Sequence, residues 1–568
     1  MRRRGAYRRH KQSRFSIVGY TVLLFTTMAG MAGAEPKVTH AGMPAVMEPK
    51  PTDTAQAAVS APTKNEAKVT IRQYRFDGTW PLEQKELMGP LADTIGKSVT
   101  FADLEKTAND LTHLLRRKGY LVATAYIPMQ DFADGTVHLA VMIGTFDGTI
   151  IENKTGAADR VLKREIRSVR KGHYIERDPL ERGILIAGDL PRTDIKAFLK
   201  AGKERGTSDL VLQAERKGED FWGYAGFDNG GYRYTGKYQY SLFMNYANPF
   251  HAGDLLSIGG VFSAQAGGMW SGSISWQSPI LVQGLRLGIS YGRSHYALGG
   301  SYASLDYAGQ SDTFSTWLQY SLHRSKPSSV YALLRYDNKK LSDGSDAYDF
   351  HTPKTASEWT VGINGDAEDK WHGGGKNNYS LTYTWGDLSI DDELSYVTDM
   401  APLGPHTSGG FGKWNFMLTR DQRISERESL CLSYQRQWAR KNLDSSEKLS
   451  LGGPYGVRAY PIGEASGDDG WLWSTEYRNT LPKKEGASDI WQLIAFVDGG
   501  HVGLYHDSRG DYTGSRSLYG MGIGINWSRK SQWVGRLHYA WRLGPEHAKD
   551  SREDSRGRLW FQLYRLFS

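Results

Sequence analysis

The chain contains a single cysteine, Cys431, among its 568 residues. A lone cysteine cannot form an internal disulfide, which excludes a disulfide-stapled exported scaffold. Cys431 alternates with Leu430, Leu432 and Tyr434, and this period of two predicts a strand with the cysteine on the face opposite the apolar side chains. We therefore expect Cys431 to be a small residue on a polar strand face and not a reactive thiol.

Long apolar runs are also missing. After residue 34 no segment approaches the ~18 consecutive apolar residues that a membrane-spanning helix needs, and the mean hydropathy is −0.52. Glycine (65), tyrosine (32) and tryptophan (17) are abundant instead. Many glycines and aromatic residues without long apolar runs favour a β protein, and a transmembrane β-barrel in particular.

The first 34 residues lack acidic side chains but carry seven cations, so the remaining sequence accounts for only about +1 of the net charge of +8. A basic start to Arg14, an apolar core from Ile17 to Met28 and small residues up to Ala34 predict a signal peptide over 1–34. An anchoring membrane helix is the weaker alternative, because the apolar core is short. The basic balance thus predicts no nucleic-acid partner.

Residues 35–68 are rich in proline, alanine and threonine, which predicts a disordered linker that buries no core. Two small α/β modules follow, at 69–145 and 146–217, each in the order strand, helix, helix, strand, strand. The alternative is one α+β domain, but the element order restarts after a single turn. The clearest helix begins after Thr100, a plausible N-cap, and ends before Gly119.

The remaining expected elements of the two modules follow from apolar spacing. In the first module strands are expected over 69–78, 122–128 and 137–143, with a short helix over 82–91. In the second module strands are expected over 146–152, 194–200 and 209–215, and helices over 158–169 and 179–187. Pro179 would be the first helical residue of the last helix, after Asp178.

From residue 218 to the end, 218–568, helical spacing gives way to alternation. In 519–527 the residues Tyr519, Met521, Ile523 and their successors share one face, and glycines share the other. Outward apolar faces with aromatic ends match lipid outside and water inside, whereas a soluble β-sandwich would seldom need so many aromatic strand ends. The spacing predicts a membrane all-β fold with sixteen strands, centred near residues 224, 240, 258, 274, 289, 317, 332, 361, 381, 416, 432, 473, 495, 523, 537 and 561.

Two motifs offer a site inside this barrel. The long connection 442–470 contains GVRAYP with Arg458, and a later strand contains AFVDGG with Asp498. A guanidinium matches a carboxylate as a planar fork, so this pair can pin the loop to the barrel wall. Phe496 shares a strand face with Asp498, Tyr460 can pack beside them, and Glu476 should point into the lumen nearby. The alternative is that these are ordinary lumen charges.

Chemical sites of other kinds have no support in the sequence. The fifteen histidines show no metal-ligand spacing, and HGGGK at 372–376 lacks the spacing of a phosphate loop. No nucleophile and base form a credible pair. We therefore expect no catalytic residue, no metal and no cofactor, and an enzyme is not predicted.

Taken together, residues 69–568 resemble the two-partner secretion transporters of the TpsB type (the ShlB/FhaC/HecB family, in the BamA superfamily of POTRA-barrel proteins). The stretch 119–144 resembles the end of the family's first POTRA domain, and 226–254 its barrel start. GGPYGVRAYP resembles the family's loop motif, with Ala459 where the motif has glycine. A positive φ at that position would now cost energy. The last strand resembles the signal of barrel-assembly machinery, although Arg565 interrupts its outward apolar face.

The resemblance implies an outer-membrane protein with its POTRA domains in the periplasm. It would secrete a partner exoprotein, of the adhesin or haemolysin type, after POTRA capture of the unfolded client. The other implied partners are outer-membrane lipid and the barrel-assembly machinery, and a monomer is expected. The implied site is a loop motif with a barrel-wall partner, made up of Val457, Arg458, Ala459, Tyr460, Phe496, Asp498 and Gly500. An assembly factor of the same superfamily and a passive porin are the alternatives, and residues 35–67 look too proline-rich for the family's plug helix.

Overall fold

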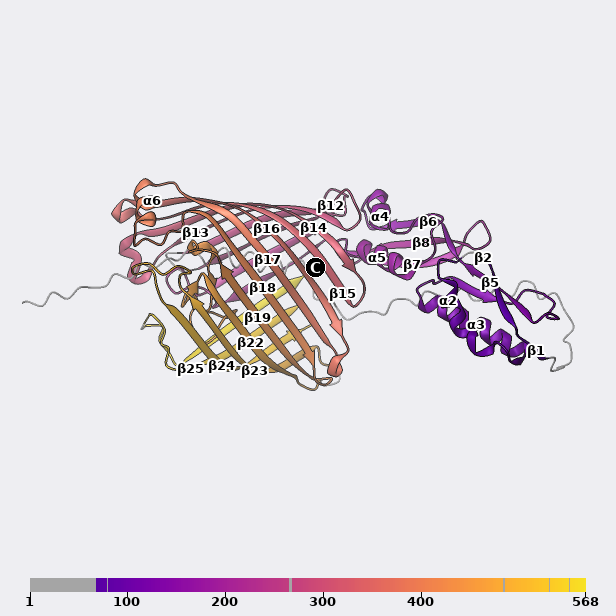
Figure 1. Ribbon diagram of the computed structural model, residues 1–568. Coiled ribbons are helices and arrows are strands. Elements are labelled where there is room, and N and C mark those ends of the chain that lie inside the picture. The colour runs from indigo at the N-terminus through magenta and orange to yellow at the C-terminus, as the bar shows by residue number, and fades with distance from the viewer. Residues whose placement is uncertain (1–67, 79, 265–267, 484–485, 531, 551) are drawn as a thin grey trace, which may run out of the picture.

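The computed structural model describes residues 68–568 except 79, 265–267, 484–485, 531 and 551. Two small modules lie in a row and lead into one end of a closed barrel (Figure 1). We call that end of the barrel the module-side rim. The expected signal peptide, and the linker up to residue 67 with any plug helix, lie outside the described residues. Within the described ranges no helix is both long enough and apolar enough to cross a membrane.

The first module folds as a three-stranded sheet with helices on it. Its sheet has the order β2-β5-β4, with β2 and β5 parallel and β4 antiparallel to β5. The single strand expected over 69–78 is divided in two, because the chain turns at the buried Ile71. Its first part, β1, pairs with β3 in a separate two-stranded sheet, and its second part is β2. The elements are β1 (Lys68–Thr70), β2 (Gln73–Gly78), α2 (Gln84–Met88), η1 (Gly89–Thr94), β3 (Ser98–Thr100), α3 (Phe101–Arg117), β4 (Ala123–Tyr126) and β5 (Thr136–Ile143).

Helix α3 begins where the sequence predicts. The Thr100 hydroxyl accepts a hydrogen bond from the Asp103 amide at 3.2 Å, and the Asp103 carboxylate accepts one from the Thr100 amide at 3.0 Å. This reciprocal pair satisfies two amides that have no partner within the helix. The helix buries Leu104, Leu111 and Leu115 against the sheet, and Gly119 after its end has a φ of 107°.

The second module repeats this topology. Its sheet has the order β6-β8-β7, again with one parallel and one antiparallel pair. The elements are β6 (Thr145–Lys154), α4 (Asp159–Glu165), α5 (Arg177–Gly188), β7 (Thr193–Ala201) and β8 (Thr207–Arg216). The expectation that α5 begins at Pro179 was wrong, since Glu176 occupies the N-cap. Proline fits in the third helical position as well, because the amides of the first turn have no helical partner.

Sixteen antiparallel strands close the barrel by pairing β26 with β9. This confirms the predicted strand number, and every predicted strand centre lies within a strand. The strands are β9 (Phe221–Asp228), β10 (Gln239–Ala247), β11 (Leu255–Ser263), β12 (Met269–Pro279), β13 (Leu285–Ala297), β14 (Tyr307–Arg324), β15 (Ser328–Ser345), β16 (Phe350–Asp369), β17 (Gly375–Ile390), β18 (Gly409–Arg423), β19 (Glu428–Ala439), β22 (Asp469–Thr480), β23 (Asp489–Gly503), β24 (Ser515–Arg529), β25 (Trp533–Leu543) and β26 (Gly557–Phe567).

The connections at the far end of the barrel carry further short elements. These are η2 (Gly300–Leu305), η3 (Asp346–Tyr348) and α6 (Glu393–Met400), and η4 (Trp371–Gly373) lies in a turn at the module-side rim. Apolar side chains such as Tyr519, Met521 and Ile523 on β24 are exposed on the outer surface. Cys431 on β19 lies in register between Asp421 and Glu476, on the inner face. The alternation read from the sequence therefore describes the two faces of the wall.

The closing pair of strands is short. Its register runs only from Gln562–Asp228 to Phe567–Gly223. Beyond it the Asn229 side chain continues the pairing, because its oxygen accepts from the Phe561 amide at 2.9 Å and its nitrogen donates to the Leu559 carbonyl at 2.9 Å. The side chain and the amide of Asn229, which donates to the Phe561 carbonyl at 3.3 Å, thus extend the seam beyond the end of β9.

The second module docks on the turns of the module-side rim through charged groups. Arg324, at the end of β14, forks onto the Asp189 carboxylate with two contacts of 2.8 Å. Arg286 donates to the Asp189 carbonyl at 2.6 Å, and the Glu165 carboxylate accepts from the Gly284 amide at 2.9 Å. The Arg324 side chain is 8% exposed, so this fork is largely shielded from water.

We predict that Asp189→Ala loosens the module on the barrel. The substitution leaves the shielded Arg324 cation without its partner, and a hydrogen bond to a charged group contributes about 2 kcal/mol. Hydrogen exchange at the turn 280–284 and in α5 should become faster. Glu215→Ala is the control, because its ion pair with Lys196 is about half exposed on both sides and contributes little. Equal protection in both variants would contradict the docking role of the fork.

Candidate functional site

The connection between β19 and β22 folds into the barrel. It contains η5 (Ser445–Glu447) and a small hairpin of β20 (Leu449–Ser450) and β21 (Ser466–Gly467). We call residues 440–468 the inward loop. Its apolar residues form one buried cluster with side chains of the wall, made up of Leu449, Leu451, Val457, Ala459, Tyr460, Ala465, Leu472, Ile494, Phe496, Val502, Leu518 and Ala540. The loop is therefore packed against the lumen wall on the side of β22 to β25.

At the tip of the inward loop Arg458 meets Asp498 of β23. Its Nε donates to Oδ2 and its Nη2 to Oδ1, both at 2.8 Å, and its own amide donates to Oδ2 at 3.2 Å. Two parallel N–H···O contacts give the planar fork that fixes orientation as well as distance. The Asp498 side chain is fully buried and Arg458 is 6% exposed, so water does not compete for this contact.

A second carboxylate completes the surroundings of the guanidinium. Arg458 Nη1 donates to Glu476 Oε2 at 2.8 Å, and Ser474 Oγ donates to Asp498 Oδ1 at 2.7 Å. The guanidinium carbon lies 3.3 Å from the centroid of the Phe496 ring, which gives a cation–π contact on its face. The structure thus brings together Arg458, Asp498, Glu476 and Phe496.

The other residues of the two motifs lie around this centre. Val457 is fully buried and its amide donates to the Leu451 carbonyl at 2.6 Å, which closes the tip of the loop. The buried Tyr460 donates its hydroxyl to the Glu546 carbonyl at 3.0 Å. Gly500 lies under the loop, where a Cβ would be 2.8 Å from a methyl group of Leu451. The motif residues therefore form one packed unit.

Ala459 occupies the position of the family's glycine without backbone strain, because its φ is not positive. The extra methyl group instead meets β24. A Cβ built on Gly520 would lie 2.6 Å from the Ala459 Cβ, closer than two carbon atoms can approach. The methyl group of Ala459 therefore fits only because residue 520 is a glycine.

Sequence reasoning missed a second set of contacts, at the base of the inward loop. The Glu447 carboxylate contacts Lys339 of β15 at 2.6 Å and Lys413 of β18 at 2.7 Å. Burial raises the pKa of Glu447, but the charges of the two lysines lower it further, so the pKa falls below its ordinary value. Further ion pairs at the loop join Lys354 with Asp444, Lys448 with Asp468, and Arg516 with Glu464.

The sequence could have predicted one side of these contacts, the charged residues on the barrel wall. Arg335, Asp337 and Lys339 alternate along β15, and such alternation marks an inner face. Arg335 and Asp337 pair with each other, and Lys339 contacts the loop. Its partner Glu447 lies in a segment without strand periodicity, so this pairing follows from the folded loop alone. In the described ranges no group of three His, Cys, Asp or Glu side chains could hold a metal ion.

Comparison with known proteins gives the family. A model of the family described as "Haemolysin secretion/activation protein ShlB/FhaC/HecB" matches residues 206–527. A model of the "POTRA domain, ShlB-type" matches residues 69–144. The "Heme/hemopexin transporter protein HuxB" of Haemophilus influenzae (strain 86-028NP) is 27% identical over 482 residues, 84% of each chain. The "Outer membrane transporter CdiB" of Dickeya dadantii (strain 3937) is 24% identical over 552 residues, 92% of each chain.

Solved structures show the same fold. CdiB from Escherichia coli has a TM-score of 0.75 and 17% sequence identity, with 98% of this chain and all of that chain covered. BamA from Haemophilus ducreyi, lacking POTRA domains 1–3, has a TM-score of 0.51 and 13% identity, with 88% of this chain covered. At these identities the likeness concerns the architecture of the barrel and its modules.

The fold and the inward loop define the class, a POTRA-barrel transporter of the outer membrane. The match over more than half of the chain identifies the family, and the protein belongs to the ShlB/FhaC/HecB family of two-partner secretion transporters. The barrel lies in the outer membrane and the modules in the periplasm. The alternative of an assembly factor does not hold, because the relatives are transporters.

We predict that Gly520→Ala destabilises the barrel and that Ala459→Gly restores most of the loss. The new methyl group would overlap that of Ala459, and overpacking of this kind costs about 1–3 kcal/mol. The measurement is electrophoresis after heating, in which the folded barrel migrates faster than the unfolded chain. The unfolding temperature should fall in Gly520→Ala and should recover in the double variant. Gly292→Ala is the control, since a Cβ there meets nothing closer than 3.7 Å. A Gly520→Ala barrel as stable as this control would refute the packing argument.

Proposed function

We propose that this transporter exports a separately encoded, unfolded exoprotein of the adhesin or haemolysin type. We further propose that the contact of Arg458 with Asp498 and Glu476 sets the position of the inward loop along the export route. The observation that carries the proposal is the buried fork of Arg458 on Asp498, at 2.8 Å for both contacts. It ties the tip of a long loop to the wall, together with the Trp560 contact to the Arg458 carbonyl.

Client capture belongs to the periplasmic modules in this proposal. Strand β7 is an edge of its sheet, pairing with β8 on one side. An extended segment of a client can add to such an edge through main-chain hydrogen bonds, which demand little of its sequence. The exposed Phe198, in the middle of β7, offers an apolar contact to the added strand. Lys196 and Lys200 on the same strand would limit unwanted pairing between copies.

The two attachments of the inward loop suggest which part of it moves. The base is held by Glu447 with two lysines and by Asp444 with Lys354. The tip depends on one arginine, with its carbonyl held by Trp560 Nε1 at 2.7 Å. We infer that the base stays in place during export and that the tip leaves its site when a client occupies the lumen.

The partners follow from the same proposal. The names of the relatives assign heme/hemopexin transport to HuxB and outer-membrane transport to CdiB, and we propose a protein client of this general kind here. Barrel-assembly machinery would read the last strand, β26, during biogenesis. We further propose that the chain acts as a monomer and performs no catalysis, since the charged groups around Arg458 pair with one another.

The experiment is an export assay in a diderm host that carries this protein and its candidate exoprotein. Arg458→Ala leaves the buried Asp498 without its cation, whereas Glu476 keeps its contact with Arg478 at 2.7 Å. Breaking a buried pair in this way costs about 3–5 kcal/mol. We expect export to fall several-fold in Arg458→Ala and in Asp498→Ala, at equal amounts of folded barrel. Arg335→Ala is the matched control, because Arg335 binds the buried Asp337 at 2.7 Å in the lumen wall and does not hold the loop.

The outcomes separate the two parts of the proposal. If export does not require this protein, the choice of cargo is wrong. If export requires the protein but is unaffected by both loop-site variants, the cargo stands and the role of Arg458 fails. If Arg335→Ala reduces export as strongly as Arg458→Ala, the effect belongs to lumen charge in general and not to the loop.

A further inference from the structure

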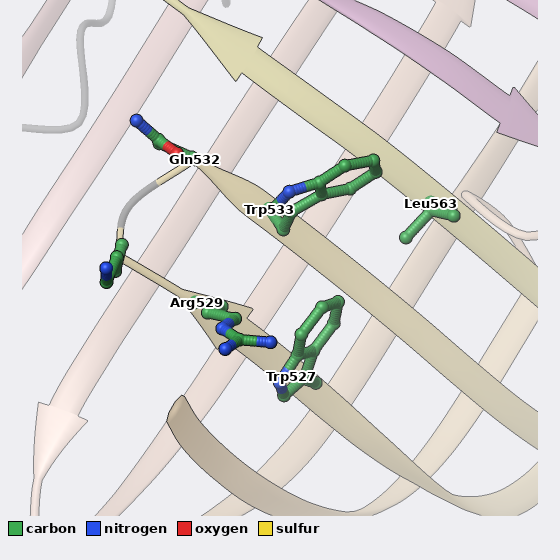
Figure 2. A pocket seen from close by; sticks show the side chains of 6 residues that line it. Trp527, Arg529, Gln532, Trp533 and Leu563 are labelled. Atoms are coloured by element: carbon green, nitrogen blue, oxygen red, sulfur yellow. The ribbon is translucent and has the colours of Figure 1, made fainter. Parts of the chain in front are cut away.

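The outer surface of the last three strands carries a recess at the module-side rim. It has a volume of about 360 Å³ and is lined by Trp527, Arg529, Lys530, Gln532, Trp533 and Leu563. Figure 2 shows the two tryptophan rings on neighbouring strands, with Leu563 on the third strand and Gln532 at the turn. This volume is within the range of small-ligand sites, which begins near ~300 Å³.

A glycine beside the recess fixes the position of one tryptophan ring. Gly535 on β25 is in register with Trp527 of β24 on one side and with Leu563 of β26 on the other. A Cβ on Gly535 would lie 3.0 Å from the Trp527 ring and 4.0 Å from a methyl group of Leu563. The Trp527 ring therefore lies over the main chain of Gly535, next to Leu563.

Cationic side chains lie at the end of the recess that faces the module-side rim. Arg529 and Lys530 belong to its lining, and the guanidinium of Arg565 lies 5.0 Å from the centroid of the Trp533 ring. Arg565 Nη1 also donates to Gln532 Oε1 at 3.3 Å, which directs this arginine toward the recess. The acid beside them is Asp489, which accepts from Trp527 Nε1 at 2.8 Å and lies 3.9 Å from Arg529.

Another arginine at this rim shows the contrast. Arg420 also lies over a tryptophan ring, that of Trp371 at 5.4 Å, but it forks onto the Asp369 carboxylate. That cluster is neutralised within the chain. Among the described residues, the ion pair at the recess is that of Arg529 with Asp489 at 3.9 Å, so Lys530 and Arg565 can offer charge to a ligand from outside.

The surroundings require an amphiphilic ligand. Trp527 and Trp533 flank the turn at the module-side rim, where aromatic side chains mark the boundary of the bilayer. On the membrane side of them Ile525, Leu537 and Leu563 are exposed on the outer surface. A ligand in the recess thus meets cations at the periplasmic boundary and apolar side chains deeper in the membrane.

We propose that this recess binds an anionic phospholipid of the periplasmic leaflet. The headgroup phosphate lies against Arg529 and Arg565, since a guanidinium matches phosphate oxygens as a fork. An acyl chain runs along Trp527 and Leu563, which line the recess. This assignment also explains Arg565, which interrupts the outward apolar face of β26 and would otherwise stand unexplained at the membrane surface. The site is independent of the loop and of the client.

The test is native mass spectrometry of the purified full chain in detergent with added phosphatidylglycerol, and with phosphatidylethanolamine for comparison. The double variant Arg529→Gln with Arg565→Gln should weaken retention of phosphatidylglycerol about thirtyfold, because each cation near an anionic lipid contributes roughly a factor of five. Gly535→Val should also weaken it, since the larger side chain would displace the Trp527 ring of the recess at unchanged charge. The control, Arg423→Gln with Arg427→Gln, removes two exposed cations from another turn of the same rim and should bind as the unmodified chain does.

Several results would overturn the proposal. If the unmodified chain retains both lipids equally, the site does not select an anionic headgroup. If the control variant loses phosphatidylglycerol as strongly as the Arg529 and Arg565 variant does, the effect comes from the overall positive charge of the rim and not from this recess. Inorganic phosphate that binds with the same dependence on Arg529 and Arg565, without a preference for the lipid, would assign the site to a free anion. Variants that bind phosphatidylglycerol normally after refolding, but fail to assemble in cells, would assign these residues to biogenesis. No client is present in the assay, so its result is separate from that of the export assay.

Discussion

The burial of one guanidinium in the lumen is the interaction on which the arrangement of the inward loop depends. Moving an arginine and a carboxylate out of water is unfavourable unless nearly every donor and acceptor is satisfied. Arg458 meets this condition through Asp498, Glu476 and the ring of Phe496. The geometry leaves the loop tip little choice of position, because a small displacement would lengthen several charge-assisted contacts at once. A buried ion pair of this kind fixes a structure more than it adds to its stability.

The base of the loop extends the same principle to another part of the wall. Glu447 joins β15 to β18 through Lys339 and Lys413, whereas Arg458 contacts β22 and β23. The inward loop therefore links strands that do not pair with each other in the sheet. Under the proposed function, a client in the lumen would pass this link, and separation of the tip would leave the base attached to the wall.

Much of the fold could be predicted because it rests on local periodicity. Alternating residues such as Tyr519, Met521 and Ile523 mark a wall strand, and Thr100 with Asp103 marks the start of a helix. The pairing of Arg458 with Asp498 was inferred from their residue types together with a family resemblance. The contacts of Glu447 could not be found in this way, because the loop has no repeating pattern and its partners Lys339 and Lys413 lie 108 and 34 residues earlier in the chain. The fit of Ala459 against Gly520 likewise depends on atomic distances that no spacing encodes.

Strand β26 connects the features of the molecule that lie on different faces. On its inner face Trp560 holds the carbonyl of Arg458, and Gln562 donates to the Tyr455 hydroxyl at 2.7 Å. Its edge pairs with β9 over the short seam that Asn229 extends. Its outer face carries Leu563 and Arg565 at the recess. The loop tip, the seam and the recess therefore share contacts with β26, and a displacement of the loop tip would remove the Trp560 contact from the strand that closes the barrel.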